Sequence, residues 1–162
     1  MDKLAYAKRQ LARIPVMYVQ LMRMHPDGMP SLGMVARFDR VGGGSGRGGS
    51  IVETVAMKNL TLTEAQQDML KWVDTAQAVY CKLLDESGKT GPKRTHDKQL
   101  AAILNDRVFN GLNFSQIRDY HFRPQISVQY VQKLYEECVK LVAQEAERRG
   151  LYKGCEGVNT SA

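Results

Sequence analysis

The sequence predicts a mainly α-helical protein: a small helical domain with a C-terminal helix-turn-helix and a flexible glycine-rich loop near the N-terminal part. Three observations support this fold class. Apolar residues recur at three- and four-residue spacing along several segments, Ser, Thr and Asn stand where helices would begin, and glycines gather at residues 42–50. The 162 residues are 43% apolar and 25% charged, which is typical of a folded domain and excludes wholesale disorder.

The first segment, residues 2–24, begins with apolar residues at helical spacing from Leu4 to Ile14. Pro15 should end or kink this helix, because proline lacks a backbone N–H. Residues 16–24 then form either a second short helix or a strand, and the pattern leaves both open. Methionines crowd this region, and we expect them to fill a core rather than to form an adaptable binding surface. They are Met17, Met22, Met24, Met29 and Met34.

The second segment, residues 25–50, breaks regular structure. It holds HPDGMPSLG and then GGGSGRGGS, in which six of nine residues are glycine. Ordering glycine costs backbone entropy, so we expect residues 42–50 to be flexible. The stretch lacks the G-K-S/T ending of a phosphate-binding P-loop, which favours a linker. The sequence therefore divides into a basic, Met-rich N-terminal region (1–50), a helical body (51–150) and a tail (151–162).

The third segment, residues 62–110, predicts two helices. Thr63 and Gln66 form a capping-box pattern at the start of the first helix, which should close near Ser87 and Gly88. Its apolar stripe consists of Met69, Trp72, Val73, Ala76, Val79, Tyr80 and Leu83. Lys93 and Arg94 fall in the connection, as candidate phosphate contacts. The second helix should run from after Thr95 to about Asn110, with Gly111 as a left-handed cap.

The fourth segment predicts a short helix, a turn and a long helix. Asn113 caps a short helix through about Asp119, and Ser127 is a strong N-cap for a helix that ends at Gly150. This is the plan of a helix-turn-helix, which we place at residues 112–149. The inward face of the long helix consists of Val128, Val131, Tyr135, Cys138, Val139 and Val142.

The start of the long helix has the side chains that a DNA-reading helix needs. No acidic residue occurs between Asp119 and Glu136. Glutamine can form paired hydrogen bonds with adenine, and lysine can reach a phosphate or a guanine. An ordinary helical hairpin with a polar face is the alternative reading. The predicted DNA-binding residues are Arg118, Arg123, Gln125, Ser127, Gln129, Tyr130, Gln132 and Lys133.

The charge pattern also indicates a polyanionic partner. Residues 1–47 hold eight basic and three acidic residues, which supply +5 of the net charge of +6. Cys81, Cys138 and Cys155 form no C-x-x-C pair, so we expect no zinc site and no other cofactor. We expect Cys81 and Cys138 to be small buried side chains.

Residues 109–117 (FNGLNFSQI) followed by residues 126–131 (ISVQYV) resemble the region 4 helix-turn-helix of sigma factors and of phage late-gene regulators. In those proteins a G-L-S-x-x-E-I-A segment leads to an I-S-x-x-x-V recognition helix. On the matching positions Leu112 and Ile117 belong to the core of the first helix, Ile126 fills the turn, Ser127 is the cap and Val131 seats the recognition helix. The chain has about three extra residues in the turn, and Asn113 replaces the usual Ser cap.

The order of a basic N-terminal part, a glycine hinge and this module is similar to that of the lambdoid phage late-gene antiterminator Q proteins, phage 21 type. The paired C-x-x-C motif of the phage lambda version is missing. The resemblance implies a factor that binds DNA near a late promoter and loads onto paused RNA polymerase with its sigma factor. It would then suppress pausing and termination, through a ring at the RNA exit channel. The basic N-terminal region would face polymerase or nascent RNA.

Two other regulatory functions stay open: a conventional phage late-gene activator of the RinA or ArpU type, and a small terminase subunit that binds packaging DNA. We expect no enzyme, since the His/acid neighbours (His25 with Asp27, His96 with Asp97, Asp119 with His121) do not build a catalytic site. No apolar run approaches the roughly 20 residues of a membrane span. We therefore expect a cytoplasmic protein of a bacterial host cell, with no membrane partner.

Overall fold

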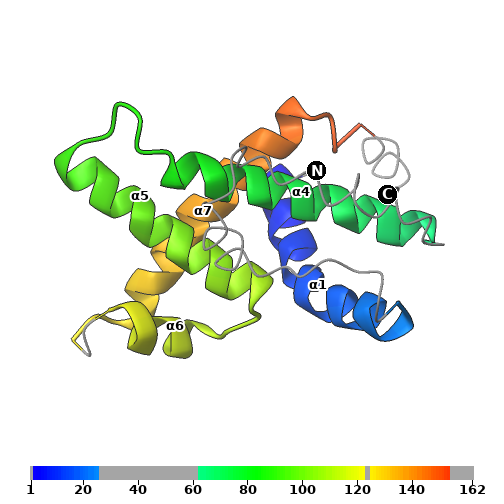
Figure 1. The fold of residues 1–162 in the computed structure, drawn as a ribbon, viewed down its shortest axis with the longest axis horizontal. Helices are drawn as coiled ribbons and strands as arrows, with labels where there is room; N and C mark the ends of the chain where they lie inside the picture. Colours follow the sequence, from blue (N-terminus) through cyan, green and yellow to red (C-terminus); the bar gives the residue numbers. More distant parts are fainter. Residues whose placement is uncertain (1, 26–61, 123–124, 154–162) are drawn as a thin grey trace, which may run out of the picture.

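The computed structural model describes residues 2–25, 62–122 and 125–153, and within these ranges the protein is mainly helical, as predicted, with no strand (Figure 1). The predicted glycine-rich loop at residues 42–50 lies outside the described residues, as do Met29, Met34, Arg123 and Cys155. The elements are α1 (Lys3–Met24), α4 (Glu64–Leu84), α5 (Gly91–Leu104), the π-helical turn η1 (Asn105–Phe109), α6 (Phe114–His121) and α7 (Val128–Arg148).

The helix starts follow the predicted capping chemistry. At α4 the Thr63 hydroxyl accepts from Gln66 N at 3.2 Å, and the Gln66 side chain accepts from Thr63 N at 2.9 Å. Asn113 forms the same reciprocal pair with Gln116 at α6. The Ser127 hydroxyl accepts from Tyr130 N at 3.2 Å at the start of α7. Each cap satisfies an N–H group that has no partner inside the helix.

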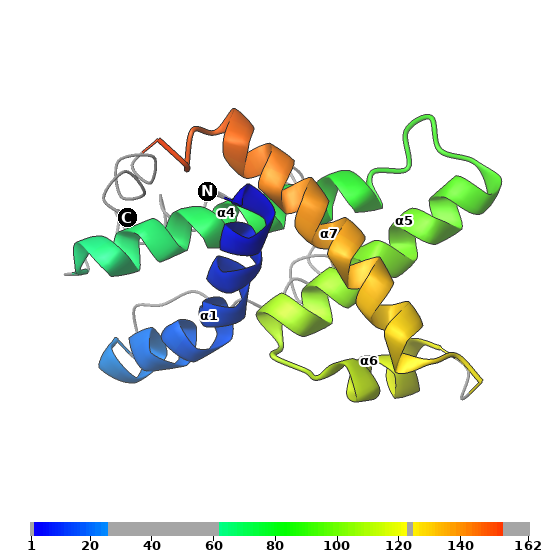
Figure 2. The same cartoon turned by 180° about the vertical axis from the view of Figure 1, so that it is seen from behind.

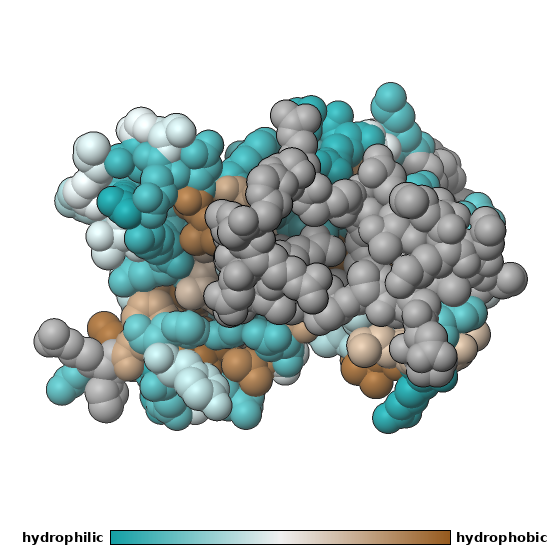
Figure 3. Space-filling view, viewed as in Figure 1, coloured by the Kyte–Doolittle hydropathy of each residue, from teal (hydrophilic) through white to brown (hydrophobic). Residues whose placement is uncertain are grey.

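Helix α7 is the central element, because α1, α4, α5 and α6 all pack against it (Figures 1 and 2). The predicted stripe of α4 is buried at every position, from Met69 to Leu83. On α7 the predicted inward residues from Val131 to Val142 are buried, while Val128 is half-buried. In the view of Figure 3, hydrophilic residues cover much of the described surface.

Helix α1 continues through Pro15 to Met24 and is bent near its middle (Figure 1). The proline removes one backbone hydrogen bond, but Ile14, Tyr18 and Leu21 are buried on both sides of it, so packing holds the helix together. These residues share one core with α4 and α7. The expectation of core-filling methionines is wrong for Met22 and Met24, which are 43% and 60% exposed.

Helix α5 begins at Gly91, earlier than predicted, because Pro92 stands in the first turn, where its missing N–H has no cost. Lys93 and Arg94 are therefore helical residues and not part of the connection. The last turn, Asn105–Phe109, is π-helical. Gly111 has φ +67°, as the predicted left-handed cap requires, and a Cβ there would lie 3.3 Å from Pro15 Cβ.

A further expectation is wrong for one of the two cysteines. Cys81 is exposed on α4, whereas Cys138 is buried and donates from Sγ to Leu100 O at 3.2 Å. Tyr152, which the sequence placed in the tail, is 3% exposed and donates to Lys3 O at 3.2 Å. Its ring meets Tyr6 and Trp72 edge to face, so aromatic packing orders the chain just after α7.

Candidate nucleic-acid interface

Helices α6 and α7 are joined by residues 122–127, and buried apolar side chains set one against the other. Ile117 is fully buried on α6, and Val131 is fully buried on α7. The Phe114 ring lies 5.5 Å from the ring of Tyr135. Burial raises the pKa of Tyr135 to about 12, so this phenol stays neutral under the packed helices. Ile126 is half-buried against the same core, which positions the start of α7.

The π-helical turn η1 holds α6 from its other side. The Asp106 carboxylate pairs with His121 at the end of α6 and accepts from Asn110 Nδ2 at 3.0 Å. The Arg107 guanidinium lies 4.3 Å from the centroid of the Phe114 ring and donates to Leu112 O at 3.0 Å. Leu112 itself is half-buried just before α6 begins. These contacts fix α6, and through it the turn, relative to α5 and η1.

The structure brings six of the predicted DNA-binding residues together. They are exposed at the turn and on the first two turns of α7: Gln125, Ser127, Gln129, Tyr130, Gln132 and Lys133. Positions 129, 130, 132 and 133 fall on one side of an α-helix, because successive residues are about 100° apart. Tyr130 is 42% exposed, and its ring lies edge-on to the ring of Phe122, with 6.3 Å between the ring centroids. The predicted face is therefore solvent-accessible and partly braced.

The electrostatics of this face are mildly positive. Lys133 forms no ion pair within the described residues. The acidic residues that follow it on α7 are engaged elsewhere, since Glu136 lies 4.0 Å from Lys8 and Glu137 lies 2.8 Å from His96. A polyanion that approached the start of α7 would meet amide groups and a lysine before it met a carboxylate.

The other predicted contacts do not join this face. The Arg118 side chain is 28% exposed, and its Nε donates to Asp119 at 3.2 Å. Arg123 lies outside the described residues. Arg94 at the start of α5 pairs with Glu86 at 2.6 Å, and Lys93 lines a pocket with the second half of α7. These contacts place Arg94 beside Glu86, just after α4, and Lys93 beside the second half of α7.

Sequence reasoning missed Tyr120, a residue that is 74% exposed on α6 beside the turn. Its signal was an aromatic residue off the apolar stripe of a short helix. Sequence reasoning also paired His121 with its near neighbour Asp119, whereas the ion-pair partner of His121 is Asp106 in η1. In the part of the chain that the structure describes, no group of three or more His, Cys, Asp or Glu side chains gathers as a metal site. No helix in that part is long and apolar enough to cross a membrane.

Comparison with known proteins finds no matching family model, no matching curated protein and no matching solved structure.

Proposed function

We propose that this protein is a double-stranded DNA-binding transcription regulator that inserts the start of α7 into the major groove. The observation that supports this is the exposed, acid-free start of α7, capped by Ser127 and braced by α6. An α-helix fits the major groove, and its first turns can reach base edges. In this arrangement Gln129 and Gln132 read bases, and Lys133 meets a phosphate or a guanine.

The regulatory step that we propose is antitermination. The resemblance of residues 109–117 and 126–131 to the sigma region 4 module of the antiterminator Q proteins supports it. The chain would bind near a phage late promoter, load onto paused RNA polymerase with its sigma factor, and make the enzyme pass pauses and terminators. The basic residues of α1 would face polymerase or nascent RNA. This role requires binding and no catalysis.

DNA reading is tested by selecting duplexes from a randomised pool with the purified chain and then measuring affinity by fluorescence anisotropy. We expect Gln129→Ala and Lys133→Ala each to weaken binding to the selected site by about 1–3 kcal/mol. Gln144→Ala and Lys140→Ala are matched controls, since both residues are exposed farther along the same helix. If the first pair binds as tightly as the controls, α7 does not read DNA.

The regulatory step is tested by single-round transcription on a template that carries the selected site, a promoter and a terminator. Antitermination raises read-through without raising the number of initiated transcripts. A rise in initiation alone would replace antitermination with conventional activation. A stable large ring in light scattering, together with unchanged transcription, would favour a small terminase subunit.

A further inference from the structure

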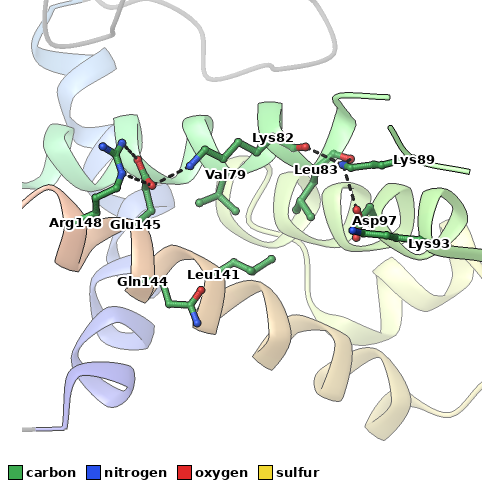
Figure 4. A pocket seen from close by; sticks show the side chains of 10 residues that line it. All are labelled: Val79, Lys82, Leu83, Lys89, Lys93, Asp97, Leu141, Gln144, Glu145 and Arg148. Atoms are coloured by element: carbon green, nitrogen blue, oxygen red, sulfur yellow. Dashed lines mark hydrogen bonds and ion pairs between the residues drawn. The ribbon is translucent and has the colours of Figure 1, made fainter. Parts of the chain in front are cut away.

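A pocket of about 440 Å³ lies between the end of α4, the start of α5 and the second half of α7 (Figure 4). Its volume is in the range of ligand-binding pockets. Aliphatic side chains of Val79, Leu83 and Leu141 lie in its middle. Cationic side chains stand at both ends, with Lys82 and Arg148 at one end, and Lys89 and Lys93 at the other.

At one end a single buried carboxylate organises the cations. Glu145 is 5% exposed and accepts from Lys82 Nζ at 3.1 Å, from Arg148 Nη2 at 2.6 Å and from Arg149 Nε at 2.9 Å. The hydrogen bonds from Arg148, and then those from Arg149 and Lys82, hold the pKa of Glu145 well below its usual value. Of the residues that line this end of the pocket, Glu145 carries one negative charge and Lys82 and Arg148 carry two positive charges, so this end is positive.

These cations keep free bonding capacity. The side chains of Lys82 and Arg148 are 66% and 67% exposed, and each uses only part of its donors on Glu145. At the other end Asp97 is neutralised by Lys89 at 3.1 Å, while exposed Lys93 forms no ion pair within the described ranges. Lys89 is less available to a ligand than Lys93, because its ammonium group also donates hydrogen bonds to Lys82 O and Leu83 O, 2.8 Å away in each case.

We infer that this pocket is a docking site for a protein segment that carries acidic side chains on both sides of a branched aliphatic side chain. The aliphatic side chain packs on Leu83 and Leu141, and the flanking carboxylates meet Lys93 at one end and Lys82 with Arg148 at the other. Gln144 at the rim offers a side-chain amide to the backbone of the segment.

Nucleic acid fits this pocket less well than an acidic peptide does. None of the described residues that line it is aromatic, so a base finds no stacking partner among them. A duplex backbone is broad and convex, whereas these cations are grouped around a recess with an aliphatic centre. The pocket is also distinct from the DNA face that we propose: Gln144 lies eleven residues beyond Lys133 on α7, which is about 16 Å along the helix axis. Both sites can be occupied together.

The test is a titration of the full chain, without DNA, followed by the methyl resonances of Val79, Leu83 and Leu141 in NMR spectra. The probe is the acetylated, amidated hexapeptide EELLEE, and the comparison peptides are EEGGEE and KKLLKK. We expect saturable shifts with EELLEE only, and weaker binding at higher salt. Lys93→Glu should weaken binding about tenfold, and Lys93→Gln by less. Lys140→Glu makes the same charge change on an exposed residue that does not line the pocket, and should leave the affinity within twofold.

Four results would overturn the inference. The first is that EELLEE leaves the methyl resonances in place, and the second is that EEGGEE binds as tightly as EELLEE. The third is that inorganic phosphate or a DNA duplex shifts the same methyl groups to the same extent as EELLEE. The fourth is that Lys93→Glu and Lys140→Glu weaken EELLEE binding equally. The peptide titration needs no DNA, so its outcome does not depend on whether the DNA-binding experiment succeeds. The DNA-binding experiment needs no peptide, so it does not depend on the titration.

Discussion

The N-cap of α7 permits a perturbation that separates folding from DNA contact. Ser127 is exposed, and its hydroxyl is held by one hydrogen bond from Tyr130 N at 3.2 Å. Ser127→Ala removes that bond and buries nothing, so it should lower the free energy of unfolding by about 1 kcal/mol. Ser127→Asp keeps an acceptor and adds a negative charge at the positive end of the helix, so its stability should equal or exceed that of the natural chain by about 0.3–1 kcal/mol.

The same two variants should rank differently in DNA binding. Ser127→Ala leaves the first turn of α7 less ordered. Its loss of DNA affinity should not exceed the free energy of the lost cap, about 1 kcal/mol, which is about fivefold in affinity. Ser127→Asp places a carboxylate beside a phosphate. At about 5 Å the repulsion is about 1 kcal/mol in bulk water and about 3 kcal/mol near a protein surface. We therefore expect Ser127→Asp, the more stable variant, to bind DNA about 5- to 150-fold more weakly than the natural chain at low salt. This difference should shrink as salt is added.

Thr63 gives the matched control, because it is an exposed N-cap of the same chemistry at the start of α4. Thr63→Ala and Thr63→Asp should repeat the stability changes in urea unfolding and leave duplex affinity in fluorescence anisotropy unchanged. The reasoning is refuted if Ser127→Asp, at about 50 mM salt, binds the selected duplex within twofold of the natural chain while remaining folded. In that case the start of α7 does not face the phosphates.

Three further outcomes follow from contacts elsewhere in the core. Glu145→Gln should lower stability by about 1–2 kcal/mol in urea unfolding at pH 7, since its partners are partly exposed. The pKa of Glu145 is lower in the folded chain than its value of 4.5 in the unfolded chain, so the ionised side chain stabilises the fold above pH 4.5. As the pH falls below 4.5, the unfolding free energies of the natural chain and of Glu145→Gln should therefore converge. Burial raises the pKa of Cys138 from 9.0 to about 12, so above pH 9 the thiol loses its proton in the unfolded chain and keeps it in the folded one. The free energy of unfolding should therefore fall by about 1.4 kcal/mol by pH 10. Cys138→Ala should not show this loss. Gly111→Ala should lower the free energy of unfolding by about 1–2 kcal/mol from backbone strain. The loss should be larger than for Gly88→Ala, because a methyl group at 111 meets Pro15, whereas one at 88 meets no atom of the described residues within 4 Å.

Local physics made much of the fold predictable from the sequence. The stripe from Met69 to Leu83 and the caps at Thr63, Asn113 and Ser127 depend on residues three or four positions apart, and the structure has them as predicted. The kinked but unbroken α1 was less predictable, because its continuity depends on the burial of Tyr18 and Leu21 in the shared core after the proline.

The candidate site was predictable to the same extent. Exposure of the start of α7 follows from the helical period, so Gln129 and Lys133 lie where the pattern put them. Contacts between distant segments carry no such signal. The Asp106 pair with His121 and the Glu145 pair with Lys82 join residues whose separation in the chain has no periodic rule. The DNA-binding assignment itself stays a prediction.

Helix α7 links the two proposed sites mechanically. It is one uninterrupted helix from Val128 to Arg148, and buried side chains hold it from Val131 to Ala146. It therefore cannot bend without losing packing against four other helices. A DNA duplex at its first turns and an acidic partner at its second half would be kept at one distance and one angle. The chain would then act as a fixed spacer between a DNA site and a protein, which is what a regulator needs in order to position an enzyme at one point on its template.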